Sequence, residues 1–195
     1  MKRFPSTLLP LLVLALAAGT ATAAPVSYTV DPDHTFPSFE ADHMAGLSVW
    51  RGKFNKNSGQ VTLDRAAGQG TVDIAIDTAS VDFGHDKLNS WATGADFFNT
   101  AQYPQAHYQG KLAGFHKGVP SRVDGALTLR GVTRPVVLQI KRFKCMPHPM
   151  FKREVCGADA LGVFQRDAFG LDAGKNYGFN MDVTLRIQIE ALQAE

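Results

Sequence analysis

The side chains in this chain that could carry out acid–base chemistry are few and scattered. Asp42-His43 and His85-Asp86 place a histidine beside a carboxylate, and such a pair can move a proton. The structural alternative is stronger, because Asp86 suits the start of a helix and His43 lies on a strand face of otherwise apolar or small side chains. The hydrolase elbow, the P-loop and the dinucleotide fingerprint are all missing. We therefore expect no catalytic residues and no cofactor.

Cys145 and Cys156 are the two cysteines of the chain. In an exported protein a disulfide is favoured, and closing so short a loop would stabilise the fold by about 3 kcal/mol on the chain-entropy model. The competing interpretation uses Cys145, His148 and Cys156 as metal ligands. A fourth ligand is not obvious, the spacing fits no zinc pattern, and the six histidines show no ligand spacing. We expect the disulfide and no metal site.

The first residues have the pattern of an export signal. Lys2 and Arg3 precede an apolar run over 8–18, which is too short to span a bilayer. The small residues that follow end at Ala23 and form an A-x-A cleavage site. We expect a signal peptide over 1–23 and a mature protein in the periplasm or secreted.

The remaining chain, 24–195, has a length that suits one domain. The formal charge of the full chain is +2 and falls to zero when Lys2 and Arg3 are removed. Charge therefore gives no argument for nucleic acid as a partner.

Alternating apolar and polar residues dominate 24–195 and predict an all-β fold. The alternation is clearest over 72–77 and 183–190, and strands are also expected over 27–31, 34–43, 49–55, 106–115, 122–130, 135–143 and 156–166, with the last strand over 177–191. Residues 131–135 are expected to form a tight turn. A closed antiparallel barrel of about eight strands is the first choice, since closure removes sheet edges, and a two-sheet sandwich is the second.

Two short helical stretches interrupt the strands. The first is expected over 85–91, and the second is expected to open at Asp96 as its cap. Phe97 and Phe98 make the second turn apolar, and Tyr103-Pro104 ends it. This helical insert is expected to pack as a lid against the barrel mouth.

The chain has 13 Phe, 4 Tyr and 2 Trp. Most of these residues are expected to fill the core. A barrel of about eight strands can nevertheless hold one small ligand, and small inward side chains leave room for it. The small residues expected to point inward are Ala41, Ala113, Ala126, Ala158 and Ala160.

Several motifs spread over nearly the whole mature chain together resemble the YceI-like family. They are Tyr28-Thr29-Val30-Asp31-Pro32-Asp33-His34, Arg51-Gly52-Lys53-Phe54, Asp96-Phe97-Phe98 with Tyr103-Pro104, 127–135 (LTLRGVTRP) and Arg166-Asp167-Ala168-Phe169-Gly170. The Cys145–Cys156 segment resembles a subgroup with a disulfide loop. One departure is Trp91, which stands where the family often has a histidine and which cannot accept a hydrogen bond.

The resemblance implies a lipocalin-like antiparallel barrel that binds polyisoprenoid or similar amphiphiles in an elongated lumen, in the periplasm, with no established enzymatic activity. Arg51 or His43 would meet a polar head group. Strand parity and the resemblance together give the expected ligand-binding residues as Phe39, Ala41, His43, Val49, Arg51, Phe54, Phe97, Phe98, Tyr103, Phe169 and Phe179.

The resulting interpretation is a periplasmic carrier or sequestering protein for a long isoprenoid chain. Two alternatives stay open: a partner protein of a membrane cytochrome b in electron transfer or stress response, and a hydrolase. A pocket of titratable residues would favour the hydrolase, whereas a long, charge-poor lumen favours the carrier. The oligomer we consider is a homodimer.

Overall fold

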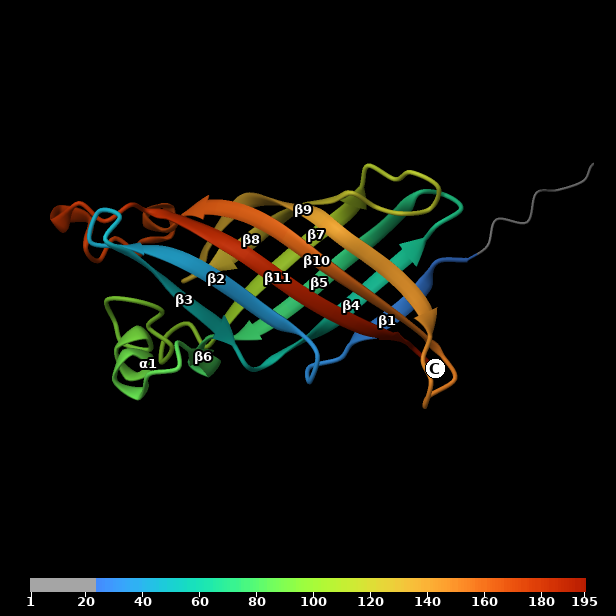
Figure 1. The fold of residues 1–195 in the computed structure, drawn as a ribbon, viewed down its shortest axis with the longest axis horizontal. Helices are drawn as coiled ribbons and strands as arrows, with labels where there is room; N and C mark the ends of the chain where they lie inside the picture. Colours follow the sequence, from blue (N-terminus) through green and yellow to red (C-terminus); the bar gives the residue numbers. More distant parts are fainter. Residues whose placement is uncertain (1–23) are drawn as a thin grey trace, which may run out of the picture.

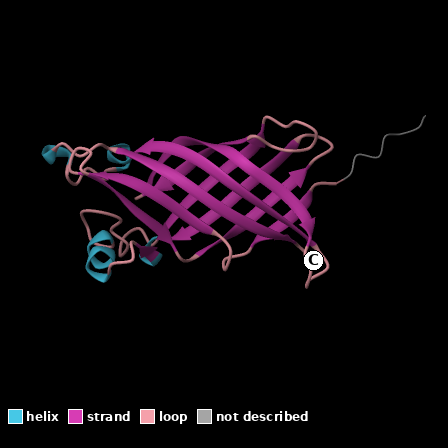
Figure 2. Cartoon of the chain, in the orientation of Figure 1, coloured by secondary structure: helices cyan, strands magenta, loops and turns pink. Residues whose placement is uncertain are grey.

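The computed structural model describes residues 24–195, so the expected signal peptide over 1–23 lies outside the described residues. The strands, shown in Figures 1 and 2, are β1 (Val26–Val30), β2 (Phe36–His43), β3 (Ser48–Phe54), β4 (Asn57–Asp64), β5 (Gln69–Asp77), β6 (Val81–Asp82), β7 (Gln105–Ala113), β8 (Arg122–Leu129), β9 (Val132–Pro147), β10 (Glu154–Gln165) and β11 (Asp182–Gln193). The helices are the 3-10 turns η1 (Thr78–Ser80), η2 (Arg166–Phe169) and η3 (Lys175–Tyr177), and the single α-helix α1 (Asp86–Ala92). Among the described residues no helix is long and apolar enough to cross a membrane.

The strands form one antiparallel sheet that closes on itself. In the ring of eight strands the order is β1-β4-β5-β7-β8-β9-β10-β11, and β11 then pairs with β1. β2, β3 and β6 continue the same sheet as an antiparallel branch that starts at β11. The prediction of a closed antiparallel barrel is thus confirmed, and the two-sheet sandwich is not the fold.

Branching is possible because β11 pairs with two strands along one edge. Its first part, Val183–Gln188, pairs with β2, and its last part, Ala191–Gln193, pairs with β1. The buried side chain of Thr35 fills the joint: its hydroxyl donates to the carbonyl of Glu190 and accepts from the N–H of Glu190, both at 3.1 Å. Asn57 donates to the Thr35 carbonyl and supports it from β4. This Thr35 joint keeps the ladder satisfied where one partner strand ends and the next begins.

Inside the barrel, one glycine makes room for a large side chain. The ring of Tyr108 on β7 lies over Gly125 on β8, where an added Cβ would come within 2.4 Å of the Tyr108 hydroxyl. The hydroxyl reaches past this position and donates to the Val136 carbonyl at 2.9 Å. Glycine at 125 therefore lets the phenol satisfy its polar atom in the wall of the barrel.

The segment between β6 and β7 lies at one end of the barrel, beside β3 and β6 (Figure 1). Its expected first helix is confirmed as α1, which starts at Asp86 and is capped by the ring of His85, whose Nδ1 accepts from Leu88 N–H. The end of the segment just before β7 is held by Thr78, whose N–H donates to the Pro104 carbonyl and whose hydroxyl donates to the Tyr103 carbonyl.

The expected second helix at Asp96 is wrong, because 95–98 form turns. The N–H groups of Phe97 and Asn99 donate to the Gly94 carbonyl, and that of Phe98 donates to Ala92 at the end of α1. Main-chain carbonyls at and just after the end of α1 thus take the donors that the Asp96 carboxylate was expected to cap.

Two strand boundaries also differ from the expectation. The tight turn expected over 131–135 is shorter, because Val132 already pairs with Leu129 and β9 begins there. Arg130 and Gly131 alone form the turn, with φ of 50° and 74°, and positive φ at both central residues matches the twist of a two-residue hairpin. At the C-terminal side, β11 starts at Asp182 instead of 177, because η3 and its flanking glycines occupy the preceding residues.

Thr35→Val should lower the free energy of unfolding by about 1–3 kcal/mol, because it keeps the shape but leaves the main chain of Glu190 without its side-chain partner in a buried site. Urea unfolding at neutral pH measures the change. Thr62→Val is a matched control, since the Thr62 hydroxyl pairs with the hydroxyl of Thr71 near the surface. Equal effects of the two substitutions would contradict the role of the joint.

Candidate ligand-binding cavity

A cavity of about 500 Å³ runs through the barrel. Its walls come from inward-facing residues of the ring, of the branch β2–β3 and of the segment that carries α1. On β11 every second residue lines it, namely Val183, Leu185, Ile187, Ile189 and Ala191. Period-2 alternation thus gives the lumen its apolar wall and the outside its polar surface.

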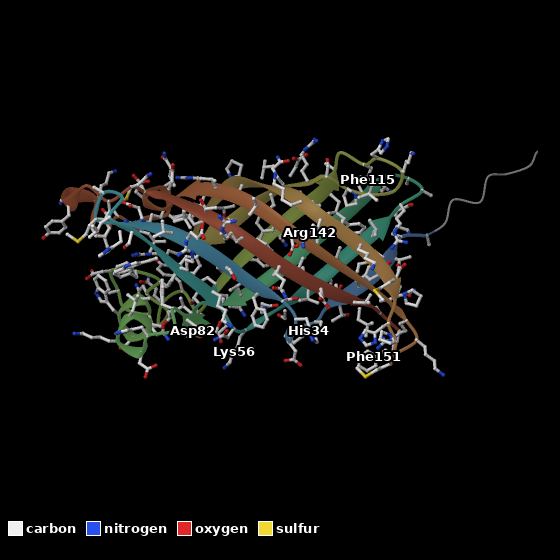
Figure 3. All side chains as sticks on the ribbon, in the orientation of Figure 1. His34, Lys56, Asp82, Phe115, Arg142 and Phe151 are labelled. Carbon is white, nitrogen blue, oxygen red and sulfur yellow. A yellow bond between two sulfur atoms is a disulfide. The ribbon has the colours of Figure 1, made fainter. Side chains whose placement is uncertain are left out.

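The end of the cavity near the β9–β10 hairpin is closed. Cys145 and Cys156 are direct cross-strand partners and form a disulfide, so that prediction is confirmed. Cys156 lines the cavity there together with Tyr28 and Ala191, which are 2% and 4% exposed. Figure 3 shows Phe151 on the hairpin beyond the disulfide, at the opposite end of the molecule from α1.

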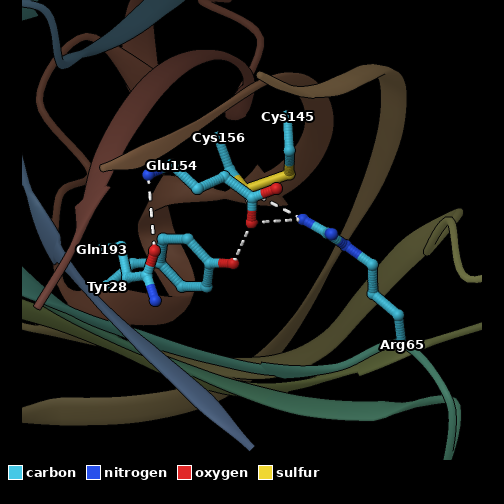
Figure 4. Close-up of a disulfide and its surroundings, with 6 residues drawn as sticks. All are labelled: Tyr28, Arg65, Cys145, Glu154, Cys156 and Gln193. Carbon is cyan, nitrogen blue, oxygen red and sulfur yellow. Dashed lines mark hydrogen bonds and ion pairs between the residues drawn. A yellow bond between two sulfur atoms is a disulfide. The ribbon is translucent and has the colours of Figure 1, made fainter. Parts of the chain in front are cut away.

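A polar network covers this closed end (Figure 4). Glu154 Oε1 accepts from the Tyr28 hydroxyl at 2.5 Å and from Arg65 Nη2 at 2.7 Å, and Arg65 Nη2 also lies 3.5 Å from the sulfur of Cys156. Gln193 accepts from the main-chain N–H of Glu154. The network joins β1, the β4–β5 turn, β10 and β11 across the barrel end.

Burial and bonding shift two pKa values in the network. Burial opposes ionisation of Glu154, but the hydrogen bonds from Arg65 and Tyr28 outweigh it and hold the Glu154 pKa below its usual range. Burial and the neighbouring Glu154 carboxylate raise the pKa of Tyr28 to about 12. Glu154 is therefore ionised and Tyr28 neutral around neutral pH.

The opposite end of the cavity is the mouth. Trp91 and Tyr177 line it and are 52% and 82% exposed, unlike the buried residues of the closed end. The ring of His43 stacks on Trp50 with centroids 4.3 Å apart and meets Phe179 edge-on at 5.4 Å. Trp50 and Phe179 line the cavity, whereas His43, at the end of β2, contacts both rings without lining it.

Six of the expected ligand-binding residues line the cavity: Phe39, Ala41, Phe54, Phe97, Phe98 and Phe179. Phe39, Phe54 and Phe98 form one aromatic cluster, with ring centroids 5.3 to 6.4 Å apart. The structure thus brings residues from β2, β3 and the α1 segment to one place.

The other five expected residues, His43, Val49, Arg51, Tyr103 and Phe169, are not among the lining residues. Phe169 is 2% exposed and packs edge-on against Phe164 in the core. Tyr103 lies against Gly131.

Arg51 lies outside because of strand parity. It pairs with Glu40 across β2 and β3, and its side chain is 70% exposed. Arg51 is three residues from Phe54, and residues an odd number apart on a regular strand face opposite sides. Since Phe54 points inward, Arg51 and Val49 point outward.

Of the small residues that were expected to point inward, some line the cavity and others do not. Ala41, Ala158 and Ala160 line the cavity, whereas Ala113 and Ala126 do not. On β7 and β8 the lining residues are instead Ala106, Tyr108, Leu112, Val123, Leu127 and Leu129.

Much of the lining comes from residues that the sequence analysis did not select, among them Trp50, Leu138, Phe143 and Leu171. The lining residues on strands could have been predicted from the sequence. Side chains alternate along a strand, so once one residue is known to point inward, every second residue from it also points inward. Arg166 is also in the wall and is 8% exposed; its Nη1 donates to the Leu171 carbonyl, and burial lowers its pKa.

The candidate acid–base and metal residues have structural contacts. His148 Nδ1 accepts from the N–H groups of Met150 and Phe151 in the β9–β10 turn. Cys145, Glu154 and Cys156 come close together, but both sulfurs are used in the disulfide and neither is a thiolate ligand.

The closed ring, the branching sheet and the long apolar lumen correspond to one known family. The model of the YceI-like domain matches residues 28–191. The chain belongs to the YceI-like family. Protein YceI of Escherichia coli O6:H1 is 36% identical over 181 residues, which cover 92% of this chain and 93% of that protein.

Solved structures share the YceI-like fold. BcnA of Burkholderia cenocepacia matches with a TM-score of 0.61 at 22% identity, over 80% of this chain and 96% of that chain. A polyisoprenoid binding domain from Saccharophagus degradans, implicated in plant cell wall breakdown, matches with a TM-score of 0.60 at 17% identity, over 87% and 99%.

Glu154→Gln tests the network at the closed end of this YceI-like barrel. The lowered Glu154 pKa means that ionised Glu154 stabilises the fold above its unfolded pKa of about 4.5, and that this contribution is lost as pH falls through the lower folded value. The variant should lose about 1 kcal/mol of unfolding free energy at pH 7, and the difference from wild type should shrink below about pH 4.

Urea unfolding across this pH range measures both effects. Glu195→Gln is the matched control, because the Glu195 side chain is 90% exposed and faces Arg153 at 3.6 Å, and such pairs contribute little. A Glu154→Gln difference that stays constant with pH would contradict the assignment.

Proposed function

We propose that this protein binds the long apolar chain of an amphiphilic lipid, an isoprenoid, in the barrel lumen. The observation that carries the proposal is a cavity of about 500 Å³ that is lined mainly by aliphatic and aromatic residues. Its lining is buried at the end near Tyr28 and exposed at the end near Tyr177. Such a shape fits a single extended chain better than a compact polar metabolite.

The energetics agree with an apolar ligand. The cavity volume lies in the range of small-molecule sites, about 300–1,000 Å³. Each methylene buried gains about 0.8 kcal/mol, so an isoprene unit of about five carbons gains up to about 4 kcal/mol. Polar atoms in the wall, such as the Tyr108 hydroxyl, already form hydrogen bonds within the protein. The wall therefore offers apolar contact area to a lipid chain and few hydrogen bonds.

The relatives support the same ligand class. The domain from Saccharophagus degradans that shares the fold is described as polyisoprenoid binding, and the chain is in the family of Protein YceI. The role that fits best is carrying or sequestering the lipid in the periplasm or outside the cell after removal of 1–23. A membrane cytochrome b as partner, and a homodimer, remain proposals of the same kind.

Ala41→Trp should weaken isoprenoid binding about tenfold or more while leaving the melting temperature close to that of wild type. The indole would enter open space near the mouth and would exclude up to about one isoprene unit, although a flexible chain can shift and recover part of the loss. In a filled core the same change would overpack and destabilise the protein by about 1–3 kcal/mol.

Ala126→Trp is the matched control, because Ala126 lies on β8 outside the lining. Titration with a fluorescent isoprenoid and thermal melts are measured for both variants. A collapsed melting temperature of ligand-free Ala41→Trp, or equal binding by both variants, would count against the proposal. Mass spectrometry of organic extracts from detergent-free protein identifies what the lumen carries.

Export is tested separately. Full-length protein expressed in a Gram-negative bacterium should be found outside the cytoplasm, with a mature N-terminus at Ala24, because an A-x-A site ends at Ala23. Intact-mass measurement after fractionation gives the result. An unprocessed chain that starts at Met1 in the cytoplasm would contradict it.

A further inference from the structure

A second, polar pocket of about 320 Å³ adjoins the mouth of the lumen. Trp91, Phe97 and Ala173 line both spaces. Trp91 and Phe97 form the shared wall, with ring centroids 4.5 Å apart. The residues that belong to the second pocket alone are Ala95, Asp96, Arg130, Gly170 and Asp172. An apolar lumen thus opens beside a polar pocket, which matches the two parts of an amphiphile.

Arg130 is the cation of this pocket. It stands in the two-residue turn between β8 and β9, where its main chain has φ of 50°. Its Nη1 donates to the Phe97 carbonyl at 2.6 Å, which fixes the half-buried guanidinium against the wall shared with the lumen. It takes part in no ion pair among residues 24–195, so its other N–H groups can serve a ligand.

Two carboxylates face the same pocket, those of Asp96 and Asp172. The neighbouring Lys175 does not neutralise them, because its Nζ is paired with Asp167 at 2.7 Å. Arg166 also lies within electrostatic range of Asp172, and of Asp42 and Asp167. The three cations Arg130, Arg166 and Lys175 then stand against the four carboxylates of Asp42, Asp96, Asp167 and Asp172, which leaves an excess of one negative charge around the pocket. Such a pocket repels a phosphate or carboxylate group, but it offers acceptors and a donor to a neutral hydroxyl.

We propose that this polar pocket holds the head group of the lumen ligand, and that the head group is an uncharged hydroxyl. The hydroxyl donates to Asp96 or Asp172 and accepts from Arg130 while the chain extends past Trp91 into the lumen. The inference rests on the proposed lipid-binding function and adds to it the chemistry of the head group.

The test uses the mature protein and three probes with the same chain: geranylgeraniol, geranylgeranyl phosphate and the corresponding hydrocarbon without a head group. Binding is followed by tryptophan fluorescence at low ionic strength, because exposed charges are screened by salt. We expect the alcohol to bind about five- to tenfold more tightly than the hydrocarbon, and the phosphate more weakly than the alcohol.

The double variant Asp96→Asn, Asp172→Asn should change the two polar probes in opposite directions. The alcohol should lose about fivefold in affinity with its carboxylate acceptors, and the phosphate should gain about fivefold as the repulsion is removed. Hydrocarbon binding should stay unchanged. Asp159→Asn is the control, since Asp159 is an exposed carboxylate on β10 near Arg142 and is not in either pocket.

Each possible result either supports or overturns the head-group site. Opposite shifts of alcohol and phosphate, with Asp159→Asn like wild type, support the head-group site. Equal affinities for alcohol and hydrocarbon, or tighter binding of the phosphate by the wild-type protein, overturn it while leaving chain binding intact. Failure of all three probes overturns the lipid-binding function and the head-group site together.

Discussion

The pairing of β11 with two strands along one edge is the constraint on which the rest of the structure depends. Without β1 the ring would stay open, and without β2 the branch that widens the lumen toward α1 would have no strand to extend. The chain turns between the two partner strands, and at this point the buried hydroxyl of Thr35 accepts from the Glu190 N–H and donates, together with the N–H of Asp31, to the Glu190 carbonyl. One side chain therefore lets a single sheet be both closed and branched.

Keeping a lumen apolar requires that polar side chains inside it be satisfied by the protein itself. The wall contains two buried tyrosines, and each hydroxyl donates to the protein: Tyr108 to the Val136 carbonyl and Tyr28 to Glu154. The third lining tyrosine, Tyr177, lies at the mouth and is 82% exposed. The rings remain as apolar surface. The Arg65–Glu154 pair that receives Tyr28 caps the closed end together with the disulfide, so charge is concentrated at the two ends of the lumen and not along it.

Alternation was enough to predict the closed antiparallel barrel, a helix-start signal to predict α1, and the two cysteines of an export-type sequence to predict the disulfide, because each depends on local pattern or on residue type. Facing was harder. Phe39 and Phe54 were placed correctly in the lumen wall. Arg51 was wrongly assigned to the same face as Phe54, although the two residues are an odd number apart. Its ion pair with Glu40 on the outer face joins two strands and is not visible in the local sequence. The turn at Asp96 depended on competition from the carbonyls of Ala92 and Gly94, which no local propensity shows. The polar pocket brings together Arg130, Asp96 and Asp172 from three segments that are distant in the sequence, so no local pattern could predict it.

The buried Tyr28, with the polar network and the disulfide that lie over it, makes the barrel a blind tube. A chain that enters a blind tube must go in tail first and come out head first, and no second molecule can push it through from behind. Residence time in such a container grows with the length of chain that has to be withdrawn, since every buried segment adds to the barrier for leaving. Cargo exchange would therefore require an acceptor that meets the mouth itself, and long chains would be held far longer than short ones of the same chemistry.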